Sequence, residues 1–174
     1  DKLHIQATTD QLTGIFNRRV IFEALDDAME NSKKSQDRQF ATIMFDIDFF
    51  KQVNDNYGHS GGDAVLISFA QLLQAEISSP NIVGRIGGEE FLAILYLSPD
   101  EALEFCKKLI KKINTNVVSY EGTDIKISSS GGVAFSTETE TSADLTNKAD
   151  ERLYEAKKDG RNRFKLIDNE LVGD

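Results

Sequence analysis

The chain has 174 residues, with 20 Lys and Arg against 29 Asp and Glu, and a formal charge of -9. This length suits one domain, and a hydrophobic content of 40% is enough to fill its core. The acidic charge argues against nucleic-acid partners and direct membrane contact, because such binders set clustered cations against phosphates. The single cysteine excludes an internal disulfide and favours a cytoplasmic location.

The sequence up to Asp48 predicts a turn, a helix and a buried strand. Asp10–Gly14 has the composition of a turn with Asp10 as its cap, and apolar residues at helical spacing predict a helix from Asn17 to about Ser35. The apolar run Phe40–Phe45 predicts a buried strand that ends at Asp46 and Asp48. These carboxylates are two residues apart, so they share one face of the strand and need a partner there.

The remaining elements mix helices, strands and one hairpin. Periodicity and turn residues predict a helix over 63–77, a turn over 78–81, strands over 82–86 and 90–97 joined through Gly87-Gly88, a helix beginning after Ser98, a strand over 125–135, a helix over 142–159 and a strand over 163–167. This order favours an α+β fold over a Rossmann fold. The chain also lacks the glycine-rich dinucleotide fingerprint and the P-loop motif.

Two acidic pairs are candidates for binding a metal ion. Mg²⁺ takes oxygen ligands, commonly one or two carboxylates together with substrate phosphates. Asp46 ends a strand, and Glu89-Glu90 follows a turn. Because neighbouring residues of a strand face opposite ways, we expect only Glu89 to face the same site as Asp46. The alternative is that both pairs are ordinary solvated acids.

The stretch from Phe49 to Asp63 is rich in groups that bind nucleotides. Its Asn and Asp side chains match the hydrogen-bonding edge of guanine, and Lys51 supplies a charge for phosphate. Later in the chain, Lys157 and Arg161 flank the end of the last predicted helix. Taken singly, each of these residues also has an ordinary structural explanation, such as a turn or a helix end that favours cations.

Taken in order, these segments resemble the GGDEF family of diguanylate cyclases from Asp10 to about Arg163. The GGEEF variant of the family motif occurs at 87–91, and a single five-residue match would be weak without the others. The further matching blocks are Asp10-x-Leu-Thr-Gly with Asn17-Arg18-Arg19, Asp46-x-Asp48-x-Phe50-Lys51-x-x-Asn54-Asp55, Gly58-His59-x-x-Gly62-Asp63, Ser130-x-Gly132-Val133-Ala134, and Ala149-Asp150 through Gly160-Arg161-Asn162.

The resemblance implies a nucleotidyl cyclase or palm-like domain of the α+β class, with a central, mostly antiparallel sheet surrounded by helices. We expect residues 1–9 to be an incoming linker or helix tail, 10–168 the catalytic domain and 169–174 a C-terminal tail. The implied reaction condenses two GTP into cyclic di-GMP with release of two pyrophosphates, in a homodimer whose cofactor is Mg²⁺ or Mn²⁺. A sensory or receiver domain is expected before the cyclase domain, and the location is cytoplasmic, either free or as the cytoplasmic part of a membrane-anchored protein.

The resemblance also assigns roles to individual residues. Metal binding is implied for Asp46, the Ile47 carbonyl, Glu89 and Glu90, with Glu89 also assisting deprotonation of the attacking 3′-hydroxyl. Guanine recognition is implied for Asn54, His59 and Asp63, and phosphate binding for Lys51, Lys157, Arg161 and the backbone amides of Phe49 and Phe50.

The chain departs from the family pattern at two places. The Arg-x-x-Asp product-inhibition site falls on Ser78–Asn81, so both charged ends are missing and no inhibition is expected through it. Phe49 stands where many members have His, and we expect only its backbone to matter. Two alternatives to a diguanylate cyclase stay open: a non-catalytic GTP-binding regulatory domain, and a cyclase with a mixed or single-nucleotide product, which Asp63 at the guanine-reading position disfavours.

Overall fold

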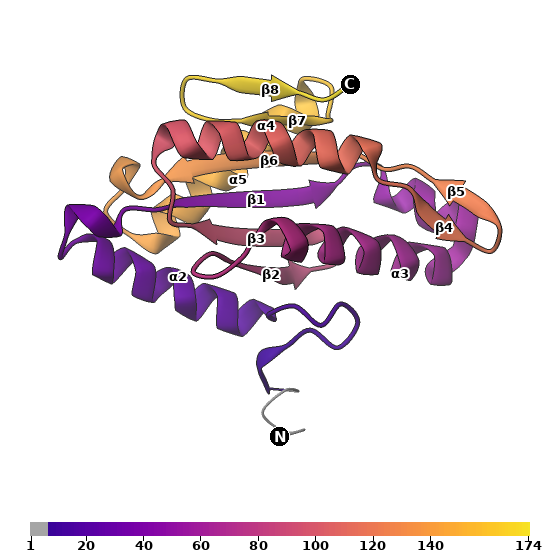
Figure 1. Cartoon of the computed structure of the whole chain (residues 1–174), viewed down its shortest axis with the longest axis horizontal. Coiled ribbons are helices and arrows are strands. Elements are labelled where there is room, and N and C mark those ends of the chain that lie inside the picture. Colours follow the sequence, from indigo (N-terminus) through magenta and orange to yellow (C-terminus); the bar gives the residue numbers. More distant parts are fainter. Residues whose placement is uncertain (1–6) are drawn as a thin grey trace.

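The computed structural model describes residues 7–174 and is built around a six-stranded sheet (Figure 1). The strand order is β2-β3-β1-β6-β7-β8, and every neighbouring pair is antiparallel except the parallel pair β6 and β7. The strands are β1 Ala41–Ile47, β2 Ile82–Gly87, β3 Glu90–Leu95, β6 Ser129–Phe135, β7 Arg163–Lys165 and β8 Glu170–Val172. The α+β class with a mostly antiparallel central sheet is therefore confirmed.

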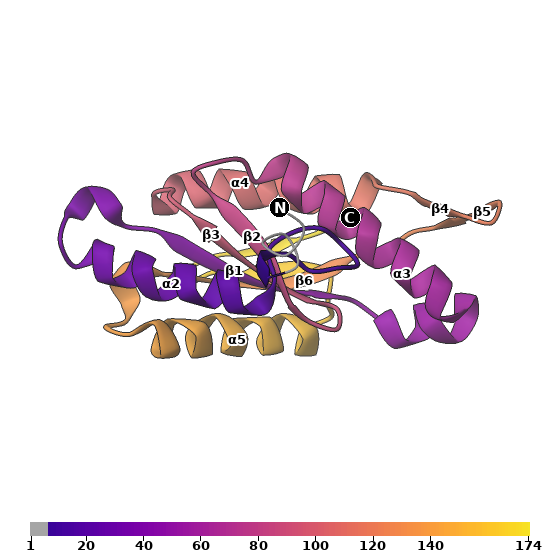
Figure 2. The same ribbon diagram turned by 90° about the horizontal axis from the view of Figure 1, so that it is seen from below.

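Helices cover both faces of the sheet, as Figure 2 shows in edge view. The helices α2 Arg18–Ser32 and α5 Ser142–Lys158 lie on one face, and α3 Phe50–Glu76 and α4 Pro99–Thr115 lie on the other. Smaller elements complete the chain: the 3-10 turns η1 Gln36–Arg38 and η2 Ser136–Glu138, and the hairpin of β4 Val118–Tyr120 with β5 Thr123–Ile125.

Strand β1 runs through the middle of the domain, and all of its residues are buried. Ile43 and Phe45 belong to the core cluster beneath α3 and α4, whereas Met44 belongs to the cluster beneath α2 and α5. The Phe45 ring meets the ring of Phe69 at 6.3 Å and the ring of Phe164 at 5.6 Å, both edge-on. Two covered faces explain the unbroken apolar run of this strand, and they bring Asp46 into a buried position at its end.

Helix α5 packs very closely on β6, and this contact sets the position of Lys157 near its end. A Cβ added at Gly132 would lie 1.9 Å from the Ala149 carbonyl oxygen and 2.5 Å from the Leu153 nitrogen. Both of these atoms are backbone, so they cannot rotate away. Gly132 therefore allows the helix to approach the strand.

Several element boundaries differ from the sequence predictions. The helix expected from Asp63 begins at Phe50 instead, with a kink at Gly58, whose φ of 74° and ψ of 177° are not helical. The strand expected over 125–135 is divided, since residues 126–128 separate β5 from β6. Within the expected 169–174 tail, residues 170–172 form β8 against β7. Of the expected incoming segment 1–9, residues 1–6 lie outside the described residues.

No helix within residues 7–174 combines the length and the apolar character that a membrane crossing requires.

Candidate nucleotide and metal site

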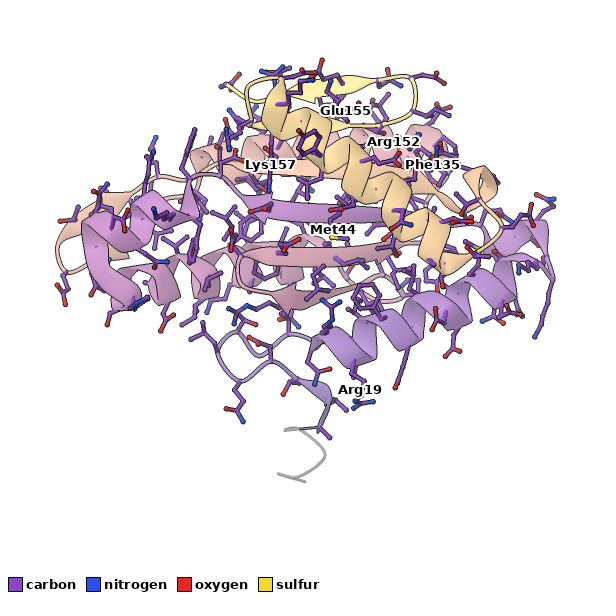
Figure 3. All side chains as sticks on the ribbon, turned by 180° about the vertical axis from the view of Figure 1, so that it is seen from behind. Arg19, Met44, Phe135, Arg152, Glu155 and Lys157 are labelled. Atoms are coloured by element: carbon purple, nitrogen blue, oxygen red, sulfur yellow. The ribbon has the colours of Figure 1, made fainter. Side chains whose placement is uncertain are left out.

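A cleft of about 290 Å³ opens at the C-terminal end of β1, and we call it the β1 cleft. Four segments meet there: the end of β1, the first turn of α3, the turn between β2 and β3, and the end of α5 with the residues that follow it. Figure 3 views the sheet from the α5 side, with Lys157 labelled near the end of that helix. The lining residues are Asp46, Ile47, Asp48, Phe49, Phe50, Lys51, Gln52, Glu89, Lys157 and Arg161.

Asp46 is a buried carboxylate that is influenced by two other acidic side chains and by only one lysine. Its side chain is directed to the α5 face, where Lys157 Nζ donates a hydrogen bond to its Oδ2. Burial raises the pKa of Asp46 to about 6, and the charges of Glu89 and Glu90 push this pKa in the same direction while Lys157 opposes them. An acid kept close to other acids in this way is characteristic of a functional site.

Glu89 and Glu90 both lie near Asp46, but one belongs to the turn before β3 and the other to the strand itself. Glu89 lies in the turn before β3, where its carbonyl oxygen accepts a hydrogen bond of 3.2 Å from the Ile47 N–H, and it lines the β1 cleft. Glu90 is the first residue of β3 and pairs directly with Asp46 across the two strands, so both side chains lie on the same face. Glu89 therefore lines the β1 cleft together with Asp46, as expected for the site, whereas Glu90 does not line it but lies opposite Asp46 on the neighbouring strand.

The donor atoms at this place suit a hard cation. Among residues 7–174, no three His, Cys, Asp or Glu side chains converge into a ready-made metal site. The Asp46 and Glu89 carboxylates nevertheless share the cleft with the backbone of Ile47, so the available donors are all oxygens. The raised pKa of Asp46 marks negative charge that a divalent cation would neutralise. These residues therefore fit Mg²⁺ or Mn²⁺ completed by substrate oxygens.

The first turn of α3 forms one wall of the cleft. Phe49, the residue before the helix, has the left-handed φ of 55°, and no side chain caps the helix start. The first bond within the helix runs from the Val53 N–H to the Phe49 carbonyl at 3.2 Å, which leaves the preceding amides without helical partners. Amides of this kind, with the exposed Lys51 beside them, suit the binding of phosphate.

The three predicted guanine-reading residues lie outside the β1 cleft. Asn54 is half-buried on the first part of α3, while His59 and Asp63 are exposed at and after the kink. A Cβ added at Gly62 would lie 1.9 Å from Asn54 Oδ1, so the Asn54 amide rests directly on the backbone next to Asp63. The Asn54 side chain thus lies against Gly62, the residue before Asp63, although the sequence pattern did not predict a helix through this stretch.

Arg85 bonds both to the turn that contains Glu89 and to the N-terminal turn at Asp10. The sequence patterns did not predict this connection. Arg85 Nε donates to the Gly88 carbonyl at 2.9 Å, and its guanidinium pairs with Asp10 at 3.2 Å. Although burial alone would raise the pKa of Asp10, hydrogen bonds from Thr13 and the charge of Arg85 hold it below its usual value. The sequence predicted Asp10 only as a turn cap, because its partner lies far along the chain.

The side chain of Phe49 makes a contact of its own at the edge of the β1 cleft. The Arg161 guanidinium lies over the Phe49 ring, 4.7 Å from its centre, and the ring is 53% exposed. The side chain of Phe49 therefore contacts a candidate phosphate-binding residue, and the expectation that only its backbone matters stays a prediction. A contact between residues so far apart in the chain has no signal in local periodicity.

Comparisons with known proteins show the family of the chain. A family model described as "Diguanylate cyclase, GGDEF domain" matches residues 7–163, and the chain therefore belongs to this family. Diguanylate cyclase DgcS of Shewanella oneidensis is 34% identical over 170 residues, which cover 98% of this chain and 56% of that protein. The chain spans between about a quarter and just over half of the length of the curated relatives it matches.

Solved structures show the same fold. Diguanylate cyclase SiaD from Pseudomonas aeruginosa, in complex with its activator SiaC, superposes with a TM-score of 0.87 at 33% identity, covering 94% of this chain and 63% of that one. The coiled coil and GGDEF domain of DgcB from Caulobacter crescentus, in complex with c-di-GMP, gives a TM-score of 0.88 at 27% identity, covering 94% and 87%.

Proposed function

We propose that this chain is a diguanylate cyclase domain, which condenses two GTP into cyclic di-GMP and releases two pyrophosphates. The observation that carries the proposal is the β1 cleft, where Asp46 and Glu89 face the cations Lys51, Lys157 and Arg161 beside an uncapped helix start. Carboxylates for a metal next to cations and amides for phosphates are what nucleotidyl transfer requires. Membership of the family, with relatives named diguanylate cyclases, supports the same reaction.

In the proposed reaction, Glu89 assists removal of the proton from the ribose 3′-hydroxyl of one GTP. The 3′-oxygen forms a bond to the α-phosphorus of the second GTP, and the bond from that phosphorus to the pyrophosphate oxygen breaks. A second, symmetrical step closes the ring. Because each domain holds one nucleotide, the active species is a homodimer in which two β1 clefts face each other.

The same residues would hold the divalent cation. Asp46, Glu89 and the Ile47 carbonyl supply oxygen ligands, and Glu90 adds negative charge directly opposite Asp46. The bound ion would lower the pKa of the nucleophile and neutralise charge on the triphosphate. The cation held by these acidic side chains would supply the local positive charge that a polyanionic substrate needs, although the chain's overall charge is negative.

The substrate is positioned at two places. Lys51, Lys157, Arg161 and the Phe49 and Phe50 amides hold the β- and γ-phosphates, while Asn54 and Asp63, with His59 beside them, read the guanine edge. Gly62 keeps the Asn54 amide next to Asp63, which favours guanine recognition at the α3 kink.

The sequence around the domain would supply its regulation. We infer that the domain is cytoplasmic and that it follows a sensory or receiver domain, the latter because the matched part is only a quarter to just over half of the curated relatives. Product inhibition through an Arg-x-x-Asp site is absent, since Ser78 and Asn81 occupy its charged positions in the turn between α3 and β2.

The test is to incubate the purified chain at high concentration with GTP and Mg²⁺, beside Glu89→Gln, and to separate the nucleotides by chromatography. Cyclic di-GMP from the unmodified chain alone supports the proposal and the role of Glu89. Where GTP binds without product, fusion to a dimerising coiled coil decides between the two remaining explanations. Product from the fusion indicates a cyclase that lacked its partner, whereas no product indicates the non-catalytic GTP-binding domain.

A further inference from the structure

Asp48 is a buried carboxylate that the proposed reaction does not use. It is 4% exposed, and its Oδ1 accepts a hydrogen bond of 2.6 Å from Ser130 Oγ. Its Oδ2 accepts one of 2.6 Å from Ser128 Oγ and one of 2.9 Å from the backbone N–H of Asn162. Its oxygens accept three hydrogen bonds, so Asp48 connects the end of β1 to the start of β6 and to the turn that follows α5.

The turn after α5 needs such support. Arg161 and Asn162 both have left-handed backbones, with φ values of 61° and 50°. Consecutive non-glycine residues in this region are strained, and they persist only where their surroundings hold them. The Arg161 N–H donates to the Ala156 carbonyl at 2.9 Å, and the Asn162 side chain exchanges hydrogen bonds of 2.8 and 3.1 Å with Asn114. Asp48 supplies the bond to this turn from the cleft side.

Phe49, the neighbour of Asp48, holds the other end of Arg161. The guanidinium lies 4.7 Å from the centre of the Phe49 ring, within the range of a cation–π contact. Phe49 itself has a left-handed φ of 55°, which turns the chain into α3. Two adjacent residues therefore restrain one arginine: Asp48 through the backbone of its turn, and Phe49 through its guanidinium.

We propose that Asp48 and Phe49 are positioning residues that hold the Arg161 guanidinium ready for the triphosphate. The inference rests on the proposed function, in which Arg161 binds the β- and γ-phosphates. Arginine loses considerable side-chain freedom when it binds a ligand, so an arginine that is already restrained binds more tightly. The restraint raises the affinity only for ligands that contact Arg161. Recognition of guanine is therefore unchanged.

The test measures affinity by calorimetry with Mg²⁺ for two probes: a GTP analogue with a methylene between the α- and β-phosphorus atoms, and GMP, which lacks the outer phosphates. We expect Arg161→Ala to weaken binding of the analogue about tenfold, and Asp48→Asn and Phe49→Leu to weaken it about three- to tenfold each. The affinity for GMP is expected to stay the same in all three variants. Phe49→Tyr, which keeps an aromatic face, is expected to recover most of the affinity lost in Phe49→Leu. Each double variant with Arg161→Ala should bind the analogue no more weakly than Arg161→Ala alone does.

Thermal unfolding first establishes that each variant is folded. If Asp48→Asn does not fold, Ser128→Ala, which removes one of the three bonds to Asp48, replaces it. Additive losses in the double variants, or equal losses for the analogue and GMP, overturn the inference. If Arg161→Ala weakens the analogue while the Asp48 and Phe49 variants do not, the inference fails and the proposed function stands. If the unmodified chain binds neither probe, both fail.

Discussion

Lys157 Nζ donates a hydrogen bond to Asp46 Oδ2 at the end of β1. The cation comes from α5 and the carboxylate from the central strand, so the pair joins a helix to the sheet at the place where we propose that substrate binds. Asp46 still carries a raised pKa, because its burial and the charges of Glu89 and Glu90 together outweigh one lysine. This imbalance makes Asp46 the residue whose titration reports most directly on cation binding.

The pKa of Asp46 predicts how stability depends on pH. Its folded value of about 6 lies above the ordinary 3.8, so its contribution to stability is complete below pH 3.8 and is lost as the pH rises through about 6. Without divalent cations, we expect the free energy of unfolding to fall by on the order of 2 kcal/mol over this interval relative to Asp46→Asn.

Denaturant unfolding between pH 4 and 7.5 measures this difference. Added Mg²⁺ should restore stability at the upper end of the range in the unmodified chain but not in Asp46→Asn, because ligand binding to the native state adds to its stability. An identical pH dependence in the two proteins would contradict the assignment of the raised pKa to Asp46.

Gly62→Ala should weaken GTP binding through Asn54. The new Cβ would lie 1.9 Å from Asn54 Oδ1, so the amide must move from its place beside Asp63. We expect the KM for GTP to rise about five- to tenfold, with a smaller change in kcat, because one neutral hydrogen-bonding side chain is displaced. Ser60→Ala, at an exposed position on the same helix, is the control. An unchanged KM in Gly62→Ala would remove Asn54 from the guanine site.

Gly132→Ala should destabilise the fold itself. Its Cβ would meet the backbone of α5 at Ala149 and Leu153, and neither atom can rotate aside. A loss of about 2 to 4 kcal/mol in the free energy of unfolding is expected from overpacking of this kind. Gly87→Ala is the matched control, since a Cβ there meets nothing within 4 Å. Equal effects of the two substitutions would show that α5 moves away from β6 without cost.

Cyclic di-GMP should not inhibit the chain through the turn at Ser78–Asn81. A cyclase assay with increasing product is expected to show no saturable inhibition at low concentrations, because a charge-assisted site needs the missing Arg and Asp. Ser78→Arg combined with Asn81→Asp should introduce inhibition, and Asn81 already accepts a hydrogen bond from the Tyr96 N–H at 2.7 Å that an aspartate would keep. Tight inhibition of the unmodified chain would disprove this prediction.

Much of the architecture could be predicted from the sequence because hydrophobic periodicity reports burial. The buried strand ending at Asp46, the hairpin around Gly87-Gly88 and the amphipathic helices on both faces follow from such patterns. The start of α3 could not be predicted in this way, because its first turns are polar and the kink at Gly58 interrupts their period. The short strand β8 lies at the sheet edge and has only three residues, too few to show a strand period.

The candidate site could be predicted only in part, for a different reason. Asp46, Glu89 and Lys157 carry motif or charge signals and do meet in the β1 cleft. The roles of Asp48 and Arg85 depend on partners far away in the chain, such as Asn162 and Asp10. Long-range contacts of this type are set by the packing of the sheet and helices, so no local pattern predicts them.

The proposed activity of the chain is to join two GTP molecules. The most direct measurement follows GTP, cyclic di-GMP and pyrophosphate together in one reaction with Mg²⁺, over a series of protein concentrations, for the unmodified chain and for Glu89→Gln. We predict two pyrophosphates for each cyclic di-GMP, a specific activity that rises with protein concentration because a dimer is needed, and no product from Glu89→Gln. GTP consumption without the cyclic dinucleotide, or a forced dimer that binds GTP and makes none, would contradict the claim.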